Sequence, residues 1–183
     1  MRQFHLSLQS GSAAVLKRMH RRYTPVEYLR AAETLRRYMP DCAVTTDVIV
    51  GFPGETEAEF RETLEFVERA KLARIHVFPY SRRKGTVADA MEGQVPEGVK
   101  HARAKKLIEL GNQLERRFVS GLLGSTQQVL FEQPAGEGLS EGYTGQYVRV
   151  RATARPGEIR SVRLDAAEGT LALGTVIDED TEE

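Results

Sequence analysis

The chain has 183 residues, in which 26 Lys and Arg residues balance 26 Asp and Glu residues, and 40% of the residues are apolar. This length and composition allow one or two domains with hydrophobic cores. No apolar run approaches the roughly 20 residues of a membrane-spanning helix, and the start of the chain, Met1 to His5, lacks the apolar core of a signal peptide. We therefore expect a cytoplasmic protein that does not enter a membrane. The single cysteine, Cys42, excludes an intrachain disulfide and any iron–sulfur cluster held by three or four thiolates of this chain alone.

The zero net charge hides an uneven distribution along the chain. Residues 1–37 contain eight Lys and Arg residues and two Glu residues, whereas residues 178–183 contain five acidic residues and no basic one. Without this acidic tail, whose simplest interpretation is a solubilising end, 26 basic residues face 21 acidic ones. A polyanionic partner is not excluded, because binding depends on a local basic face and not on the total charge.

Three segments rich in apolar or β-branched residues are predicted to be strands: 5–8, 43–50 and 74–79. Helical patterns separate them, which indicates parallel βα units whose binding groups lie at the C-terminal ends of the strands. Those ends are rich in Gly, Ser and Pro, and they comprise residues 9–12, 51–55 and 79–81. Glycine at a strand end lets a ligand approach the backbone, although such turns are also common as simple connections. In the assembled sheet we expect an open inner face that carries Val48, Ile49, Val50, Ile75 and Val77.

Capping residues mark the helix starts. Ser12 is expected to cap a helix over 13–20, and Thr24 and Thr56 are each followed three residues later by Glu, the pattern of a capping box. A long amphipathic helix is predicted over residues 97–120.

Beyond Gly121 the pattern changes to short alternating segments separated by turn residues. Four of these segments are predicted to be strands: 128–131, 147–151, 159–164 and 173–177. They predict a small antiparallel β-barrel of the kind that binds nucleic acids, with a domain boundary near residue 122.

Several residues could carry chemistry, each with a structural alternative. Asp47 lies among Val, Ile and Thr, so if it is buried its charge needs either a salt bridge or a ligand. The histidines have no metal-ligand spacing, and no metal site is expected. In the predicted barrel, aromatic rings that could stack on bases alternate with arginines that could contact phosphates. These residues are Tyr143, Tyr147, Arg149, Arg151, Arg160 and Arg163. The alternative is an ordinary solvated strand face.

Taken together, these motifs resemble a known family. Residues 9–12, 19–24, 46–56 (TDVIVGFPGET) and 77–86 resemble, in order, the later barrel motifs of radical S-adenosylmethionine methylthiotransferases, and residues 141–150 are similar to their RNA-binding TRAM domain. Residues 76–81 look most like the MtaB branch, which modifies threonylcarbamoyladenosine at position 37 of tRNA. The neighbouring branches act on isopentenyladenosine (MiaB) and on a ribosomal protein (RimO).

The resemblance implies an α/β fold class: the C-terminal half of a radical SAM βα barrel followed by a small antiparallel β-barrel (TRAM, OB-like). In that family, cysteine motifs hold [4Fe-4S] clusters that cleave S-adenosylmethionine and take part in sulfur transfer, and those cysteines are absent here. The chain begins at what resembles the fourth of six strands. The expected domains are a partial barrel with a long helix at 1–121, a TRAM domain at 122–178 and an acidic tail at 179–183.

Carried onto this chain, the resemblance gives a set of residues that would bind S-adenosylmethionine. The methionine and ribose parts would face Gln9, Ser10, Ser12, Asp47, Ile49 and Gly51; Phe78 and Tyr80 would lie near the adenine, and Arg22 would bind the carboxylate. The family pattern Gly-x-Ile-x-Gly-x-x-Glu is met in part, since Asp47 replaces the first Gly and the acid falls one place late, at Glu55. No catalytic residue is assigned.

Two functions are compatible with this sequence. The first is a C-terminal fragment of a tRNA methylthiotransferase, inactive alone, with tRNA as partner and neither membrane nor DNA expected. The second is a stand-alone RNA-binding protein that keeps the barrel remnant as a scaffold. The sequence upstream of Met1 distinguishes them.

Overall fold

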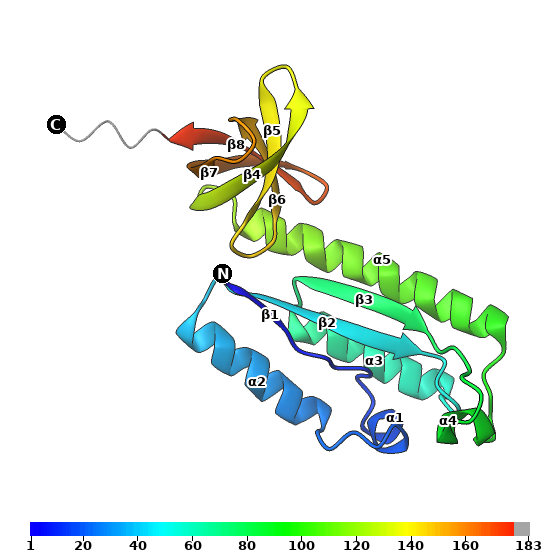
Figure 1. Cartoon of the computed structure of the whole chain (residues 1–183). Coiled ribbons are helices and arrows are strands. Elements are labelled where there is room, and N and C mark those ends of the chain that lie inside the picture. The colour runs from blue at the N-terminus through cyan, green and yellow to red at the C-terminus, as the bar shows by residue number, and fades with distance from the viewer. Residues whose placement is uncertain (178–183) are drawn as a thin grey trace. The chain divides into compact units, whose positions relative to one another are not determined.

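The computed structural model describes residues 1–177 and divides into two compact units (Figure 1). The sheet unit comprises residues 4–40 and 44–114, and the barrel unit comprises residues 1–3, 41–43 and the chain from Glu115. The predicted acidic tail lies outside the described residues. None of the helices in the described part is long and apolar enough to span a membrane.

The sheet has three strands in the order β1-β2-β3. These are β1 (Gln3–His5), β2 (Ala43–Val50) and β3 (Arg74–Pro79). The β2 and β3 strands confirm the predicted ranges and pair in parallel, from Thr45 opposite Arg74 to Val50 opposite Pro79.

The first strand differs from the prediction of 5–8, because β1 ends at His5. The hydroxyl of Thr46 accepts a hydrogen bond from the Leu8 amide at 2.8 Å and donates one to the Leu6 carbonyl at 2.6 Å. The Thr46 side chain thus takes the place of a backbone hydrogen-bond partner for Leu6 and Leu8. The regular hydrogen bonding between β1 and β2 therefore stops at His5, although residues 6–9 still run beside β2.

Five helices follow the chain: α1 (Ala13–Arg18), α2 (Pro25–Tyr38), α3 (Glu57–Ala70), α4 (Val87–Ala90) and α5 (Glu97–Gly121). Both predicted capping boxes are confirmed, at the starts of α2 and α3. Ser12 occupies the predicted N-cap position of α1, but its side chain makes no capping hydrogen bond. Helix α1 also ends before residue 20, because His20 adopts a left-handed conformation with φ of 54°.

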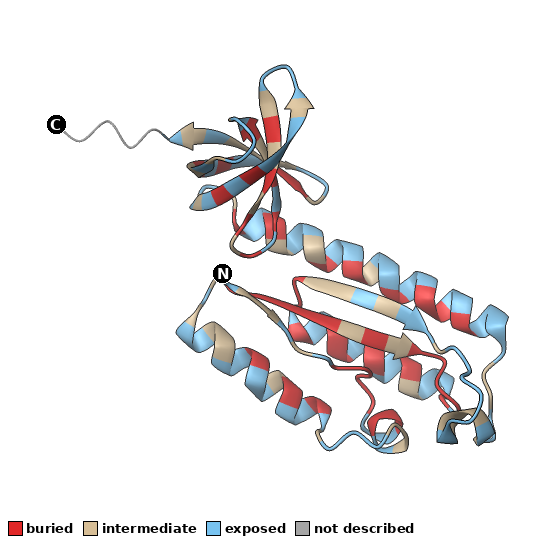
Figure 2. Cartoon of the chain, in the orientation of Figure 1, coloured by how far each residue is buried: buried red, intermediate tan, exposed pale blue. Residues whose placement is uncertain are grey.

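The two faces of the sheet differ in burial (Figure 2). Val48 and Val50 are completely buried, whereas Asp47 and Ile49 are half-buried on the opposite face. In register with them on β3 lie His76 and Phe78. The expectation that Val48, Val50, Ile75 and Val77 line the open face is therefore wrong, because side chains alternate along a strand and only Ile49 of the five lies on that face. The face that carries Asp47, Ile49, His76 and Phe78 combines polar and aromatic side chains.

The barrel unit contains a closed five-stranded barrel in the order β4-β5-β6-β8-β7. Its strands are β4 (Thr126–Gly136), β5 (Leu139–Thr144), β6 (Arg149–Thr153), β7 (Ile159–Glu168) and β8 (Leu171–Ile177). The sequence predicts four of them and misses β5, whose segment contains Ser, Glu and Gly, residues uncommon in strands. The prediction of a fully antiparallel barrel is also wrong, since β6 and β8 pair in parallel. A closed ring with an odd number of strands cannot alternate direction throughout.

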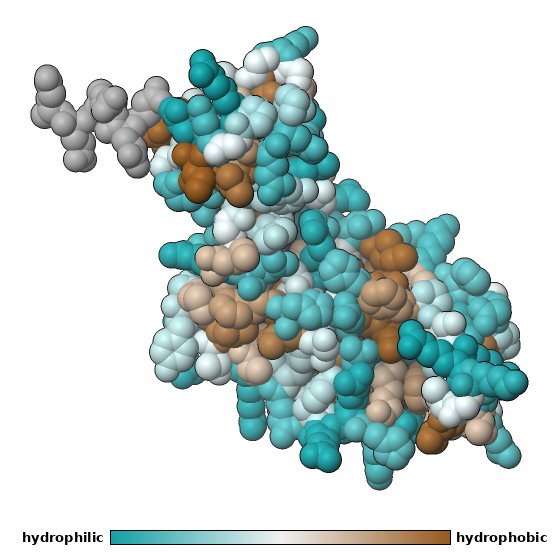
Figure 3. Space-filling view, viewed as in Figure 1, coloured by the Kyte–Doolittle hydropathy of each residue, from teal (hydrophilic) through white to brown (hydrophobic). Residues whose placement is uncertain are grey.

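Apolar side chains fill the barrel. Buried residues from its strands and from the end of α5 include Val119, Val129, Phe131, Val150, Val162 and Leu164. On the face of the molecule shown in Figure 3, apolar patches appear on both units among larger hydrophilic areas.

Candidate functional site

A pocket of about 420 Å³ opens at the C-terminal ends of β2 and β3. It is lined by Gln9, Asp47, Ile49, Phe78, Pro79, Tyr80, Ser81, Arg83, Thr86 and Ala88. Five of the nine residues predicted to bind a cofactor meet here, from three segments that are distant in the sequence. The position agrees with the rule that ligands of parallel βα units bind at the carboxyl ends of the strands.

The polar side of the pocket rests on Gln9 and Asp47. Gln9 has a left-handed backbone with φ of 68°, its amide donates to the Asp47 carbonyl, and its carbonyl accepts from the Ile49 amide, both at 2.9 Å. The Asp47 carboxylate lies 3.3 Å from Nε2 of His5. Asp47 therefore has a partner within the sheet and also lines the pocket, and its contact with a ligand stays a prediction.

The aromatic side of the pocket is formed by Phe78 and Tyr80. Phe78 is 50% exposed, so its ring is available to a ligand. The Tyr80 ring packs edge-on against Phe52 at a centroid distance of 5.3 Å, and Nζ of Lys100 lies 5.4 Å from the Tyr80 ring centre. The buried Tyr80 hydroxyl has no hydrogen-bond partner among the described residues. The exposed Phe78 ring suits a flat, aromatic part of a ligand.

Three predicted residues support the strand ends from outside the pocket lining. Ser10 and Ser12 are completely buried, and the Ser10 hydroxyl lies 3.2 Å from that of Thr63 on α3. Gly51 has φ of 73°, and a Cβ there would clash with the aliphatic chain of Lys100. Arg22 is also absent from the lining, and it lines a second pocket beside α1.

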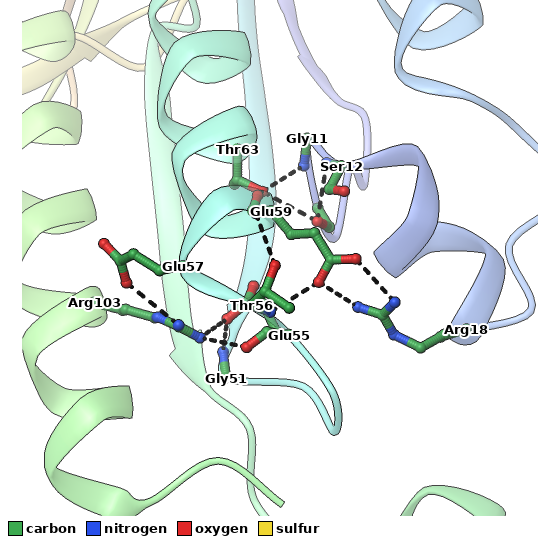
Figure 4. Close-up of polar contacts among 11 residues, drawn as sticks. Gly11, Ser12, Arg18, Gly51, Glu55, Thr56, Glu57, Glu59, Thr63 and Arg103 are labelled. Carbon is green, nitrogen blue, oxygen red and sulfur yellow. Dashed lines mark hydrogen bonds and ion pairs between the residues drawn. The ribbon is translucent and has the colours of Figure 1, made fainter. Parts of the chain in front are cut away.

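A buried ion pair lies beneath the β2 loop. Oε2 of Glu55 accepts from the Gly51 amide at 2.6 Å and from the Arg103 guanidinium at 2.8 Å (Figure 4). Burial raises the pKa of Glu55 from its usual range, while the Gly51 amide and Arg103 act in the opposite direction. This arrangement fixes the Gly51 turn, which gives Glu55 a structural role.

Lys100 connects the same loop to β3. Its side chain is 2% exposed, and Nζ donates to the Tyr80 carbonyl at 3.0 Å and to Glu97 at 2.6 Å. Sequence reasoning missed Lys100 and Arg103, because both look like solvated charges on an amphipathic helix. The signal that could have found them is their spacing of three residues, which places both on one face of α5.

On the barrel, four of the predicted RNA-binding residues lie near one another, on β5, on β6 and in the turn between these strands. The rings of Tyr143 and Tyr147 lie 5.6 Å apart, and Tyr147 is 44% exposed. Arg149 is opposite Tyr143 across β5 and β6. Glu141 binds Arg151 at 2.6 Å and lies 3.8 Å from Arg149.

Two further predicted arginines lie on β7. Arg163 is paired with Asp165 at 2.7 Å, and Arg160 lies 3.8 Å from Glu158. Acidic groups thus partly neutralise each of the four arginines.

Residues 1–67 match the family model of the radical SAM superfamily. A solved radical SAM enzyme, coproporphyrinogen III oxidase (HemN) from Escherichia coli, superposes on 65% of this chain with a TM-score of 0.52 and 20% sequence identity. This likeness covers 28% of that enzyme and, at this identity, shows a similarity of fold alone.

Curated relatives with higher identity are named tRNA methylthiotransferases or tRNA-2-methylthio-N(6)-dimethylallyladenosine synthases. The chain is 44% identical over 171 residues to the threonylcarbamoyladenosine tRNA methylthiotransferase MtaB of Thermotoga maritima, covering 92% of this chain and 39% of the relative. The MtaB of Bacillus subtilis is also 44% identical, over 80% of this chain and 33% of its own length. The tRNA-2-methylthio-N(6)-dimethylallyladenosine synthase of Maricaulis maris is 40% identical, over 96% of this chain and 40% of its own. The chain is thus homologous to part of these enzymes and spans less than half of their length.

Proposed function

We propose that this chain carries part of the S-adenosylmethionine site and the tRNA-binding barrel of a radical SAM tRNA methylthiotransferase. The observation that carries the proposal is the pocket in which Gln9, Asp47, Ile49, Phe78 and Tyr80 meet at the strand ends. The match of residues 1–67 to the radical SAM superfamily supports it independently.

In this proposal the adenosine part of S-adenosylmethionine binds beside Phe78 and Tyr80. The half-exposed Phe78 ring offers a stacking surface, and Tyr80 lines the same pocket. Gln9 and Asp47 would orient the more polar part of the molecule. Ser10, Ser12 and Gly51 act through the backbone that they hold at the strand ends.

The residues of this chain do not fit a [4Fe-4S] cluster. A cluster of this kind is held by several cysteine thiolates, and the chain has one cysteine, Cys42, which is buried. The described residues also contain no group of three or more His, Cys, Asp or Glu side chains that could hold a metal ion. Cluster chemistry therefore depends on residues that this sequence does not contain, and we propose that the chain alone is inactive.

For the nucleic acid partner we propose tRNA, bound by a TRAM-like barrel. The relatives act on tRNA according to their names, and Tyr147 with Arg149 exposes a ring and a cation of the kind that bind unpaired bases and phosphates. For the target we propose threonylcarbamoyladenosine at position 37, which is supported by the 44% identity to the MtaB of Thermotoga maritima.

Sequencing the genomic DNA and transcript upstream of the Met1 codon tests the proposal. An in-frame segment that encodes the cluster cysteines is the expected result. A translation start signal directly before Met1 would contradict it and favour a stand-alone RNA-binding protein.

Ligand titration tests the partial pocket directly. Without a cluster iron to hold the amino and carboxylate groups, S-adenosylmethionine should bind with a dissociation constant weaker than about 1 mM, or roughly −4 kcal/mol. Ligand-observed NMR should show saturation transfer from the protein to the adenine protons of S-adenosylmethionine. This transfer should decrease in the Phe78→Ala variant. Micromolar affinity would contradict the half-site.

A further inference from the structure

The pocket beside α1 has no role in the function proposed above. It has a volume of about 710 Å³ and is lined by Ala13, Lys17, His20, Arg21, Arg22, Tyr23 and Thr24. Lys17, His20, Arg21 and Arg22, which we call the basic turn, are all exposed. The pocket therefore presents the positive groups of Lys17, Arg21 and Arg22 to solvent.

The charge of the basic turn is not neutralised within the described part of the chain. Residues 1–26 contain no Asp or Glu. Among residues 1–177, no carboxylate forms an ion pair with Lys17, Arg21 or Arg22. Their neighbour Arg18 differs, since it binds Glu59 through two hydrogen bonds of 2.9 and 2.7 Å.

Lys17 lies in the last turn of α1, where a cation also stabilises the helix end. Arg21 and Arg22 lie beyond the end of α1, so stabilisation of the helix end does not explain the presence of these two cations.

The backbone holds the basic turn in one conformation. The Arg21 amide donates to the Leu16 carbonyl at 2.9 Å and the His20 amide to the Lys17 carbonyl at 3.1 Å, with His20 left-handed. This is the hydrogen-bond pattern of a Schellman motif, which usually places glycine at the left-handed position.

Tyr23, which follows the basic turn, is tied to the segment between β1 and the pocket that Gln9 lines. The Tyr23 hydroxyl donates to the carbonyl of Ser7 at 2.7 Å and lies 3.1 Å from that of Leu8. The backbone that carries the cations is thus fixed before any ligand binds.

The barrel arginines provide a contrast. Arg149, Arg151 and Arg163 each have a carboxylate within 3.8 Å. A phosphate must compete with those carboxylates, whereas at the basic turn it meets cations that have no partner in the described residues. An extended polyanion such as RNA gains most where several unpaired cations lie together.

We propose that Lys17, Arg21 and Arg22 form a second RNA-binding surface, which holds backbone phosphates of the RNA that the barrel binds. The proposal rests on tRNA binding by this chain. It assigns Arg22 to a nucleic acid phosphate in place of the cofactor carboxylate, because Arg22 lines the basic pocket and not the pocket of Phe78 and Tyr80.

The test compares two triple variants of the full chain in binding unmodified tRNA over a range of salt concentrations. The first is Lys17→Gln, Arg21→Gln and Arg22→Gln. The matched control is Arg30→Gln, Arg37→Gln and Arg61→Gln, which removes the same charge from exposed positions on α2 and α3. Melting temperatures verify that both variants fold.

The basic-turn variant should bind at least about tenfold more weakly at low salt, and the slope of log K against log salt should fall by about 2, since each phosphate contact contributes roughly 0.7 to 0.9. The control should keep the slope of the wild type. An equal loss of tRNA affinity in both variants, or no loss in either, would overturn the inference. Neither outcome would contradict the proposal that the wild-type chain binds tRNA. Absence of tRNA binding by the wild-type chain would instead contradict the proposed function.

A parallel sedimentation assay with phosphatidylglycerol vesicles examines a different polyanion. If wild-type chain binds the vesicles, the basic-turn variant does not, and tRNA affinity is unchanged, the surface binds membranes and the RNA proposal is wrong.

Discussion

The carboxylate of Glu55 lies 2.8 Å from the guanidinium of Arg103, and the two side chains are 0% and 7% exposed. Removing one partner from such a pair leaves an uncompensated buried charge, which typically costs about 3–5 kcal/mol. We therefore expect Arg103→Met to destabilise the sheet unit by about this amount in urea unfolding followed by circular dichroism.

A double-mutant cycle separates the charge pair from simple packing. In a Glu55→Gln background no buried carboxylate remains, so Arg103→Met should cost at least about 1 kcal/mol less than in the wild type. The same cost in both backgrounds would mean that Arg103 acts through its packing on the Phe60 ring, 5.3 Å away.

The pair of Arg18 and Glu59 should make the sheet unit sensitive to acid. The hydrogen bonds from Arg18 are the main cause that lowers the pKa of Glu59 in the folded chain. In the unfolded chain the pKa of the Glu59 carboxyl is about 4.3. As the pH falls past this value, the unfolded chain binds a proton at Glu59 more readily than the folded chain does. The pair therefore stabilises the fold at pH values above the pKa of Glu59 in the unfolded chain. This stabilisation is lost as the pH falls through the lower pKa of Glu59 in the folded chain.

Glu59→Gln keeps the shape of the side chain and removes the charge. At pH 7 we expect it to lower the free energy of unfolding by about 1–3 kcal/mol, as for hydrogen bonds to charged groups. The difference from the wild type should shrink below pH 4. A difference that is constant from pH 7 to pH 3 would show that the charge plays no part. The exposed Glu62 on the same helix provides a control, since Glu62→Gln should have little effect at any pH.

Gly142 is essential to the barrel for a steric reason. A Cβ at this position would clash with the Leu130 carbonyl and the Phe131 backbone on β4. Gly142→Ala should destabilise the barrel by about 3 kcal/mol, at the upper end of overpacking effects. Faster hydrogen exchange in residues 126–177 would measure the loss. Gly121→Ala is the control, because nothing lies within 4 Å of a Cβ there; a similar loss in this variant would contradict the steric explanation.

Local signals account for the parts of the structure that the sequence predicts well. Thr24 with Glu27 and Thr56 with Glu59 lie within one helical turn, so both capping boxes are predictable from the sequence. The β-branched run of residues 43–50 likewise predicts β2.

The parts that escaped prediction depend on contacts between distant residues. Strand β5 is formed by its pairing with β4 and β6, since its own residues favour turns. In the site, Glu55 and Arg103 are 48 residues apart in the sequence. The alternation along β2 places Val48 and Asp47 on opposite faces, but which face is covered depends on the helices that pack on the sheet. Five residues predicted to bind the cofactor line one pocket because strand ends in βα units converge, whereas the separate position of Arg22 follows from the turn after α1.

Tyr143 and Tyr147 should respond differently to truncation. Tyr147 is 44% exposed, whereas Tyr143 is half-buried and lies between Leu130 and Arg149 in the barrel wall. If the exposed ring stacks on a base, Tyr147→Ala should weaken tRNA binding by about 1–3 kcal/mol at an unchanged melting temperature. Tyr143→Ala should lower the melting temperature as well, because it removes packing from the wall. Tyr147→Phe serves as the matched control, since it keeps the ring and should retain most of the affinity. Full tRNA binding by Tyr147→Ala would contradict stacking at this position, and a lowered melting temperature in the same variant would instead assign the ring to the barrel's packing.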